Sequence, residues 1–185
     1  MSRVPIWFER KFEFSFRVEL LPNLCARLRG TPARLEEVVR GRSHTILIGK
    51  TQAKWSAQEN AGHLLDLESL VSQRIDEYLA GNSALHAADM SNRKTYDANH
   101  NDVAADSILK AFRAARHDII NRLESLDAEI FERSALHPRL NVSMRLVDMI
   151  FFQAEHDDYH LARINEIKKL SEIKKNQCLE SCSSS

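Results

Sequence analysis

Glycine and proline are scarce in this chain, which has 5 glycines and 4 prolines among 185 residues. An all-β protein needs many tight turns, and such turns depend on these two residues. The composition therefore argues against an all-β fold and favours a helical one. A length of 185 residues suits one domain with a hydrophobic core of its own.

The chain also lacks an excess of either charge, since 26 Lys and Arg residues balance 26 Asp and Glu residues. Electrostatic binding of nucleic acid needs a cluster of Lys and Arg residues in excess of acidic ones, so we expect no nucleic-acid partner. No apolar run approaches the length that spans a bilayer, and charges interrupt the apolar residues of the segment 1–12. We therefore expect no membrane span and no signal peptide.

Cysteine is scarce as well, with three in the chain. Cys25 lies among apolar residues of a predicted helix, which indicates a buried, inert thiol. Cys178 and Cys182 are four residues apart and could bind a metal, but they precede a run of serines. We expect exposed thiols in a mobile tail, 176–185. The odd number of cysteines and the absence of a signal sequence indicate a cytoplasmic protein.

Hydrophobic periodicity predicts four helices. They cover residues 22–39, 56–80, 104–126 and 143–175. The first is expected to break at Gly30 and to restart with Thr31 as its N-cap and Pro32 as its first helical residue. The second begins with a capping box, in which Ser56 is the N-cap and Glu59 the reciprocal partner.

Three other segments have no helical period. Residues 1–21 are rich in aromatic residues, and Phe12, Phe14 and Phe16 alternate with polar ones, which is typical of a strand. With no partner strand evident, we expect an extended segment over a helical core. Residues 82–101 form a loop long enough to suggest a functional role. Residues 127–142 form another connection, and we expect one domain over residues 1–175.

Three histidines carry the strongest functional signal. His156 and His160 are four residues apart and therefore share one face of the fourth helix. Like them, His63 falls on the buried stripe of its own helix. Burying three imidazoles without partners is costly, and a divalent metal ion would satisfy them. Gly62 costs on the order of 1 kcal/mol in a helix relative to alanine, which predicts a close approach of another helix beside His63.

Three neutral ligands would leave coordination positions of the metal open, which is the arrangement of a catalytic site. A metal in such a site lowers the pKa of a bound water, or holds a thiolate or a carbonyl oxygen. Imidazole suits zinc, nickel, copper or iron(II). The other interpretation is that the three histidines make core hydrogen bonds without a metal.

Several polar residues could orient the imidazoles. Gln153 and Asp157 lie close to His156 along the fourth helix, and Glu59 lies one turn before His63. Such partners are usual around metal-bound histidines. The alternatives are that Glu59 only completes the capping box and that Asp157 is solvated.

The long loop offers further candidates. Asn99 and His100 could reach the mouth of the site and bind a substrate, and His100 or Glu59 could transfer protons. His100 could equally lie on the surface. His137, in the next connection, is a weaker candidate of the same kind.

The two histidine segments together resemble the DinB/YfiT-like superfamily. The first is Trp55-Ser56-x-x-Glu59-x-x-Gly62-His63-Leu64, the second is Glu155-His156-Asp157-x-x-His160, and the resemblance extends over residues 22–170. It implies an all-α four-helix bundle in an up-down-down-up arrangement that is often dimeric. It also implies a divalent metal, usually zinc or nickel, on His63, His156 and His160. Some relatives activate a low-molecular-weight thiol such as bacillithiol or mycothiol, and many are described as metal-dependent hydrolases.

Two functional hypotheses follow. In the first, the protein is an enzyme, a thiol transferase or a hydrolase, whose metal activates a low-molecular-weight thiol or water for a small-molecule substrate. In the second, it is a non-catalytic helical homodimer in which the metal holds the second and fourth helices together. Fold and metal alone do not fix the reaction.

Overall fold

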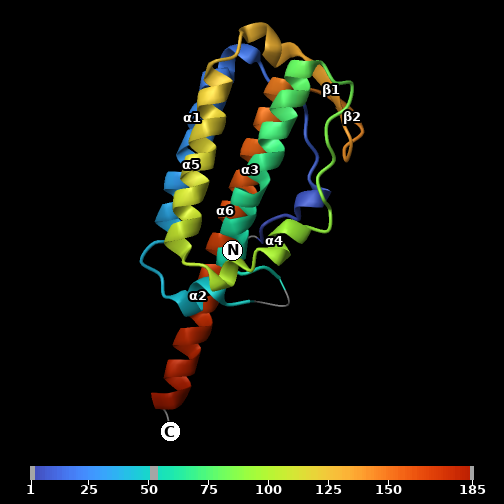
Figure 1. Cartoon of the computed structure of the whole chain (residues 1–185). Helices are drawn as coiled ribbons and strands as arrows, with labels where there is room; N and C mark the ends of the chain where they lie inside the picture. The colour runs from blue at the N-terminus through green and yellow to red at the C-terminus, as the bar shows by residue number, and fades with distance from the viewer. Residues whose placement is uncertain (1–2, 51–53, 184–185) are drawn as a thin grey trace.

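A bundle of four long helices forms the protein. The computed structural model describes residues 3–50 and 54–183, with side chains described up to residue 170. The long helices are α1 (Leu21–Val39), α3 (Ala57–Ala80), α5 (Ala105–Glu124) and α6 (Leu146–Ser183). In Figure 1, α3 and α5 run in one direction while α1 and α6 run in the other. The up-down-down-up four-helix bundle implied by the family resemblance is therefore confirmed.

This topology explains the long loop before α5. Consecutive helices α3 and α5 are parallel, so the chain must return along the whole length of the bundle between them. The connection runs down the outside of the bundle (Figure 1) and contains the short helix α4 (Arg93–Asp97) and the 3-10 turn η3 (His100–Asp102). The sequence predicted this segment as a loop. It has to be long because it connects two parallel helices.

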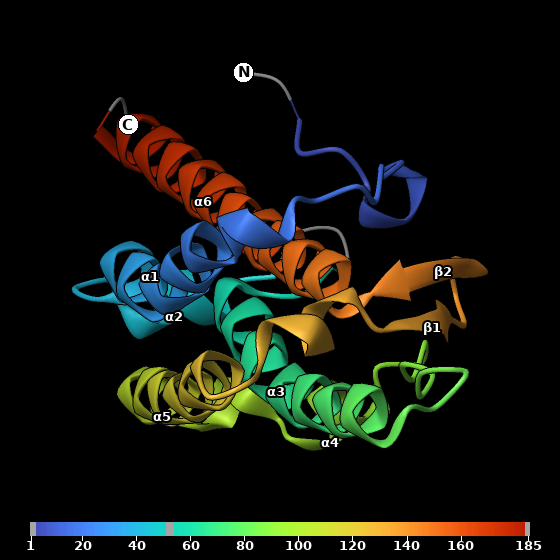
Figure 2. The ribbon, with the colours of Figure 1, turned by 90° about the horizontal axis from the view of Figure 1, so that it is seen from above.

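The connections hold more structure than the sequence predicted. A short helix α2 (His44–Ile48) precedes α3, and 3-10 turns lie at Trp7–Glu9, Val18–Leu20 and Ala128–Glu132. Strands β1 (Ser134–His137) and β2 (Val142–Arg145) form an antiparallel hairpin beside one end of α6 (Figure 2). The all-α prediction missed this hairpin, because strands of four residues leave almost no periodic signal. For the same reason α6 begins at Leu146 and not near Ser143.

The break predicted in the first helix is wrong, because α1 continues through Pro32. Proline has no N–H, so the carbonyl oxygen of Leu28 loses its helical partner. The side chain of Arg116 on α5 donates to that oxygen, with 3.4 Å between Nη1 and O. Thr31 does not cap a helix; its hydroxyl donates to the Asp157 carboxylate at 2.9 Å. A partner on another helix therefore compensates for the proline, and the sequence of α1 alone could not reveal it.

The core consists of two hydrophobic clusters separated by a polar layer. One cluster centres on Leu28, Ile75 and Leu123, and the other on Leu35, Leu64 and Phe112. Each of the four long helices contributes one residue to the layer between them: Thr31, Glu68, Arg116 and Asp157. Buried charges need such mutual pairing, so this layer fixes the relative heights of the helices.

The aromatic N-terminal segment lies extended over the bundle, as predicted. Phe14 and Phe16 pack against the first hydrophobic cluster. Trp7 is 6% exposed and packs against Phe152 of α6, with 5.0 Å between the ring centroids. The segment thereby covers one face of α6. Cys25 is buried and unpaired, which confirms the prediction of a buried thiol.

The last helix is longer than predicted, since α6 ends at Ser183 instead of Lys175. The side chains of Cys178 and Cys182 lie outside the described residues. The mobility of residues 176–185 and the domain boundary at residue 175 stay predictions.

Among the described residues, no helix combines the length and the apolar character needed to cross a bilayer.

Candidate metal centre

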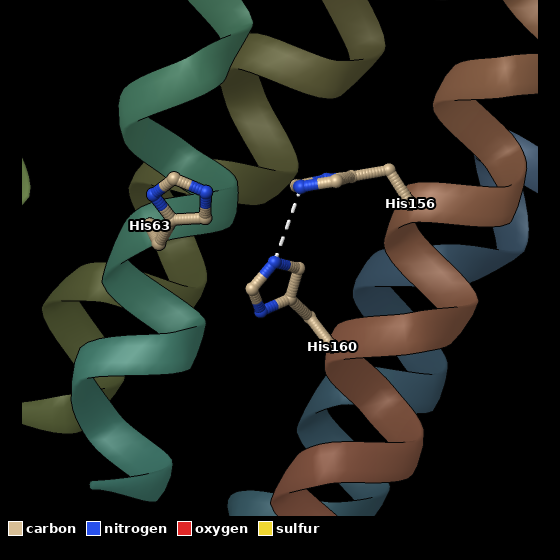
Figure 3. A group of neighbouring side chains, drawn as sticks. All are labelled: His63, His156 and His160. Carbon is tan, nitrogen blue, oxygen red and sulfur yellow. Dashed lines mark hydrogen bonds between the residues drawn. The ribbon is translucent and has the colours of Figure 1, made fainter. Parts of the chain in front are cut away.

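The three predicted histidines converge between α3 and α6. His63 projects from α3, while His156 and His160 project from successive turns of α6 (Figure 3). One nitrogen from each imidazole lies within 4.8 Å of the other two. The ring centroid of His63 is 4.9 Å from that of His160 and 5.5 Å from that of His156. The i, i+4 spacing on α6 and the inward stripe of α3 thus produce the cluster that the sequence predicted.

The environment keeps the three imidazoles neutral. Burial lowers the pKa of His63 to about 4. Burial and the neighbouring histidines hold the pKa values of His156 and His160 well below their usual range. A neutral imidazole has a nitrogen lone pair to offer a metal, and a protonated one does not. All three side chains are therefore in the ligand-competent form at neutral pH.

His63 is oriented by a chain of hydrogen bonds. Its Nδ1 lies 3.0 Å from the hydroxyl oxygen of Thr95 in α4. Against the effect of burial, His100 and then the Thr95 hydroxyl lower the pKa of Asp66, one turn further along α3 than Gly62 and His63. With the Thr95 oxygen as the acceptor of His63 Nδ1–H, the lone pair of Nε2 is available for a metal.

Asn60 orients the imidazole of His160 through a hydrogen bond. The Asn60 side-chain nitrogen donates to the carbonyl oxygen of Ser56 at 2.7 Å, which turns Oδ1 toward His160. His160 Nδ1 lies 2.8 Å from that oxygen and donates to it. The proton is therefore on Nδ1, and Nε2 again carries the lone pair.

His156, the third imidazole of the cluster, has a buried nitrogen without a hydrogen-bond partner among the described residues. His156 Nε2 and His160 Nε2 are 3.2 Å apart, facing each other (Figure 3). The two Nε2 atoms form a hydrogen bond, in which His156 donates because His160 carries its proton on Nδ1. His156 Nδ1 is thereby left as a buried acceptor without a partner among the described residues, which a core of hydrogen-bonded histidines avoids. A divalent ion held by the three imidazoles fits the residues present, with positions left for water or a substrate.

A cavity of about 420 Å³ opens onto the cluster. Its size suits a small molecule. Aromatic side chains form much of the wall beside the histidines, among them Trp7, Trp55, Tyr96, Phe152 and Tyr159. Trp55 packs against His63, with 4.6 Å between the ring centroids. The site is therefore a walled pocket and not an exposed cluster on the surface.

The predicted candidates from the loop and the helix start lie outside this cavity wall. Glu59 completes the capping box, accepting from the Ser56 N–H at 2.8 Å, and also pairs with Lys50. His100 is buried and lies 2.8 Å from Asp66 through Nε2. Asn99 has a left-handed backbone and donates to the carbonyl oxygen of Asp97. Catalytic or substrate-binding roles for Glu59, Asn99 and His100 stay predictions.

The two residues predicted to orient His156 differ in position. Gln153 lines the cavity and donates to Asp157 at 3.0 Å. Asp157 is fully buried and belongs to the polar layer with Arg116. Within the described residues, neither has a hydrogen bond to any of the three histidines. Their influence on the site is through the position of α6.

The residues that do orient the imidazoles, Asn60 and Thr95, were not identified from the sequence. Asn60 had a recognisable signal, because it precedes His63 by three positions and shares its buried stripe. Thr95 had none, since it lies in the long connection and reaches His63 only through the tertiary fold. Arg139, which also lines the cavity, lies in the turn between β1 and β2 and was missed for the same reason. Arg74 lies within the predicted second helix and was missed as well.

Comparison with known structures supports the fold. YfiT from Bacillus subtilis, described as "a probable metal-dependent hydrolase with an unusual four-helix bundle topology", matches with a TM-score of 0.77 at 19% identity. The match covers 89% of this chain and 94% of that one. A mycothiol-dependent maleylpyruvate isomerase matches with a TM-score of 0.62 at 7% identity, over 76% of this chain and 59% of that one. At these identities the likeness establishes the fold alone.

Sequence comparison establishes the family. No curated protein matches the chain. The family model of the DinB superfamily matches residues 27–164, which include α3, most of α1 and all three histidines. Together with the bundle topology, this match confirms the resemblance noted in the sequence: the chain belongs to the DinB superfamily.

Proposed function

We propose that the protein is a metal-dependent enzyme that binds one divalent ion, zinc or nickel, on His63, His156 and His160. The observation that carries the proposal is the convergence of three neutral imidazoles, two of them oriented through Nδ1, on one wall of a cavity. When bound, such an ion makes a coordinated water or thiol acidic enough to act as a nucleophile at neutral pH. YfiT, described as a probable metal-dependent hydrolase, and the mycothiol-dependent isomerase are consistent with this class of chemistry.

The residues around the cluster favour a low-molecular-weight thiol over water as the nucleophile. Hydrolysis needs a general base within hydrogen-bond reach of the attacking water. The acidic residue in the described cavity wall is Asp89, whose carboxylate already accepts from the N–H groups of Ser91 and Arg93. A bound metal would deprotonate a coordinated thiol outright, whereas it would leave a coordinated water with a pKa of about 7. The thiol would therefore depend less on such a base. Trp55, Tyr96 and Tyr159 would hold the apolar part of the substrate and exclude water from the histidines.

The alternative is a structural metal in a non-catalytic module. It has support in the placement of the ligands, because an ion held by His63 and by two residues of α6 would tie α3 to α6. The cavity argues against it, since a purely structural site has no need of open space beside the ligands.

Metal analysis of untagged protein is the first test. We expect about one zinc or nickel ion per chain in the wild type and in a His117→Ala control, whose histidine is on the surface of α5. We expect none in His63→Ala. If protein prepared without chelator has no metal and takes up none on addition, the proposal is wrong.

Removal of the metal separates the enzyme from the structural module. For the enzyme, a chelator should abolish turnover of thiol and ester substrates and lower the melting temperature only slightly. For the module, the melting temperature should fall strongly, and no thiol-dependent or hydrolytic turnover should be found in the loaded protein.

Two further parts of the proposal come from the resemblance and the composition. A homodimer is expected because related bundles are often dimeric, and sedimentation analysis would test it. A cytoplasmic location is expected from the odd number of cysteines, and cell fractionation would test it.

A further inference from the structure

The cavity wall has an excess of positive charge that the rest of the chain does not share. The chain as a whole has no net charge. The wall, however, contains four cationic side chains and one carboxylate: Lys54, Arg74, Arg139, Arg163 and Asp89. Arg163 is paired with Glu166, its neighbour on α6. Two of the other cations, Arg74 and Arg139, have no ion pair with a carboxylate among the described residues.

Arg139, in the turn between β1 and β2, is the centre of this group. Its guanidinium lies over two aromatic rings, 5.3 Å from the centroid of Phe8 and 5.5 Å from that of Phe152. Its Nη2 is buried and has no hydrogen-bond partner among the described residues. Burial lowers the pKa of Arg139, which shows that its charge is partly desolvated without a carboxylate to offset the cost.

Arg74 of α3 adds a second uncompensated charge. It is 7% exposed, and its Nε and Nη2 both donate to the carbonyl oxygen of His86, at 3.2 and 2.9 Å. A neutral carbonyl satisfies these donors but leaves the charge unpaired. Asp76 is paired with Arg122, and Glu77 is engaged with the N–H of His86 and with Gln73. Burial and, to a smaller extent, the charge of Arg139 lower the pKa of Arg74, while Tyr78 and Glu77 oppose this shift.

His137 supplies a third donor. Its Nδ1 accepts from the N–H of Leu140 at 3.3 Å, which places the proton on Nε2. That Nε2 is buried without a partner among the described residues. The imidazole packs against Phe152, with 5.4 Å between the ring centroids. Two unpartnered donors, Arg139 Nη2 and His137 Nε2, therefore belong to one turn of the hairpin and pack against the same ring.

We propose that Arg139, Arg74 and His137 form a binding site for an oxyanion, a carboxylate or a phosphate, carried by the small-molecule substrate. A planar guanidinium suits two oxygens of such a group. An oxyanion would accept hydrogen bonds from Arg139 Nη2 and His137 Nε2, and its negative charge would pair with the two guanidinium groups. Buried donors and cations in a native cavity call for an explanation of this kind.

The site is placed to work with the metal centre. Phe152, which contacts Arg139, and His156, a metal ligand, are one turn apart on α6, roughly 6 Å along the helix axis. Both side chains line the same cavity. The substrate would thus present its reacting end to the histidines while Arg139 holds its anionic end a few bonds away. This last step depends on the proposed function, but the oxyanion site itself does not.

Titration of metal-free protein with inorganic phosphate tests the site separately from the metal. The protein would be stripped with a chelator, dialysed into a buffer without oxyanions, and titrated by calorimetry at low ionic strength. We expect phosphate to bind the wild type, and Arg139→Gln to weaken binding about tenfold or more, as expected when a charge-assisted hydrogen bond is lost. Arg139→Lys should fall between, since it keeps the charge and loses the planar fork.

A matched control removes a positive charge elsewhere. Arg113 is exposed on α5 and paired with Glu36, and Arg113→Gln should leave phosphate affinity within about twofold of the wild type. Circular dichroism and thermal melting would confirm that each variant is folded. A parallel titration with acetate distinguishes the two oxyanions, because the ligand that binds more tightly indicates the group on the substrate.

Three results would overturn the oxyanion site. These are no binding of phosphate or acetate to the metal-free wild type, equal binding by Arg139→Gln, and binding that appears only after zinc or nickel is restored. The last would place the anion on the metal. Failure of the metal proposal gives a different result, a protein that takes up no metal and still binds phosphate through Arg139.

Discussion

The imidazole of His100 lies directly against the backbone of Gly62, so closely that a β-carbon at position 62 would be 2.2 Å from the ring. The sequence predicted a close approach of a helix at this glycine, but the partner is the buried His100 of the 3-10 turn η3 before α5. Nε2 of His100 is held at 2.8 Å from Asp66, which lies one turn along α3 from His63. The glycine therefore allows the long connection to dock behind the metal centre.

Gly62→Ala is expected to destabilise the protein. Alanine is better than glycine in a helix by about 1 kcal/mol, but forcing a methyl group into a packed site costs about 1–3 kcal/mol or more. His100 cannot move without breaking its bond to Asp66. We expect a net loss of roughly 1–3 kcal/mol in the free energy of unfolding by urea denaturation.

Gly30→Ala is the matched control. Gly30 is also inside a long helix, α1, but a β-carbon there meets nothing within 4 Å. This substitution should stabilise the protein by about 0.5–1 kcal/mol, since it gains helix propensity without a clash. Equal stabilisation by both substitutions would contradict the docking role of Gly62.

Thr95→Val should weaken metal binding while Thr95→Ser should not. Valine has the shape of threonine but no hydroxyl to accept from His63 Nδ1, so the imidazole loses its fixed orientation. Loss of such a partner typically reduces metal affinity about 10- to 100-fold. Competition with a chromophoric chelator would measure the affinity. Equal affinity in the valine variant would show that Thr95 does not orient the ligand.

The three histidines of the cluster could be predicted from the sequence because helical period alone determines their positions. His156 and His160 share a face at a spacing of four, and His63 falls on the buried stripe of a helix whose start is marked by the Ser56–Glu59 capping box. These are local properties of the chain. The capping box was confirmed in full, with both reciprocal hydrogen bonds present.

What could not be predicted depends on contacts between distant segments. Pro32 predicts a break in the first helix. The break is absent because Arg116, 84 positions later in the sequence, donates to the carbonyl oxygen of Leu28. Thr95 and Arg139 lie in connections whose paths are fixed by the parallel arrangement of α3 and α5 and by a hairpin of four-residue strands. The place of a side chain from such a segment depends on the tertiary fold and cannot be obtained from hydrophobic periodicity.

Arg116→Met is expected to be among the most destabilising single substitutions in the chain. Arg116 is 1% exposed and pairs with Glu68 and Asp157 between the two hydrophobic clusters. Its removal leaves two buried carboxylates unpaired, which costs about 3–5 kcal/mol. The triple variant Arg116→Met, Glu68→Gln, Asp157→Asn should recover part of the loss, because it has no unpaired buried charge. Urea denaturation of the three proteins would measure this, and a triple variant less stable than Arg116→Met would contradict it.

The metal-free protein should lose stability as the pH falls from about 6.5 toward 4. Burial lowers the pKa of His63 and of His137 to about 4, against an ordinary value of 6.5. Between these values the unfolded chain binds protons that the folded protein excludes, so the free energy of unfolding decreases as the pH falls. Each of these histidines contributes on the order of 3 kcal/mol when the whole interval is crossed. Urea denaturation at pH 7, 6 and 5 would show the slope.

The matched variant is His137→Asn, which removes one of the four histidines with lowered pKa values and leaves the three of the cluster in place. Its slope between pH 6.5 and 5 should be shallower than that of the wild type, because carboxylates with ordinary pKa values near 4 contribute little in this interval. Metal should flatten the slope further, since protons and metal compete for the same nitrogens of His63. A wild-type stability that is constant from pH 7 to 5 without metal would contradict the lowered pKa values of His63 and His137.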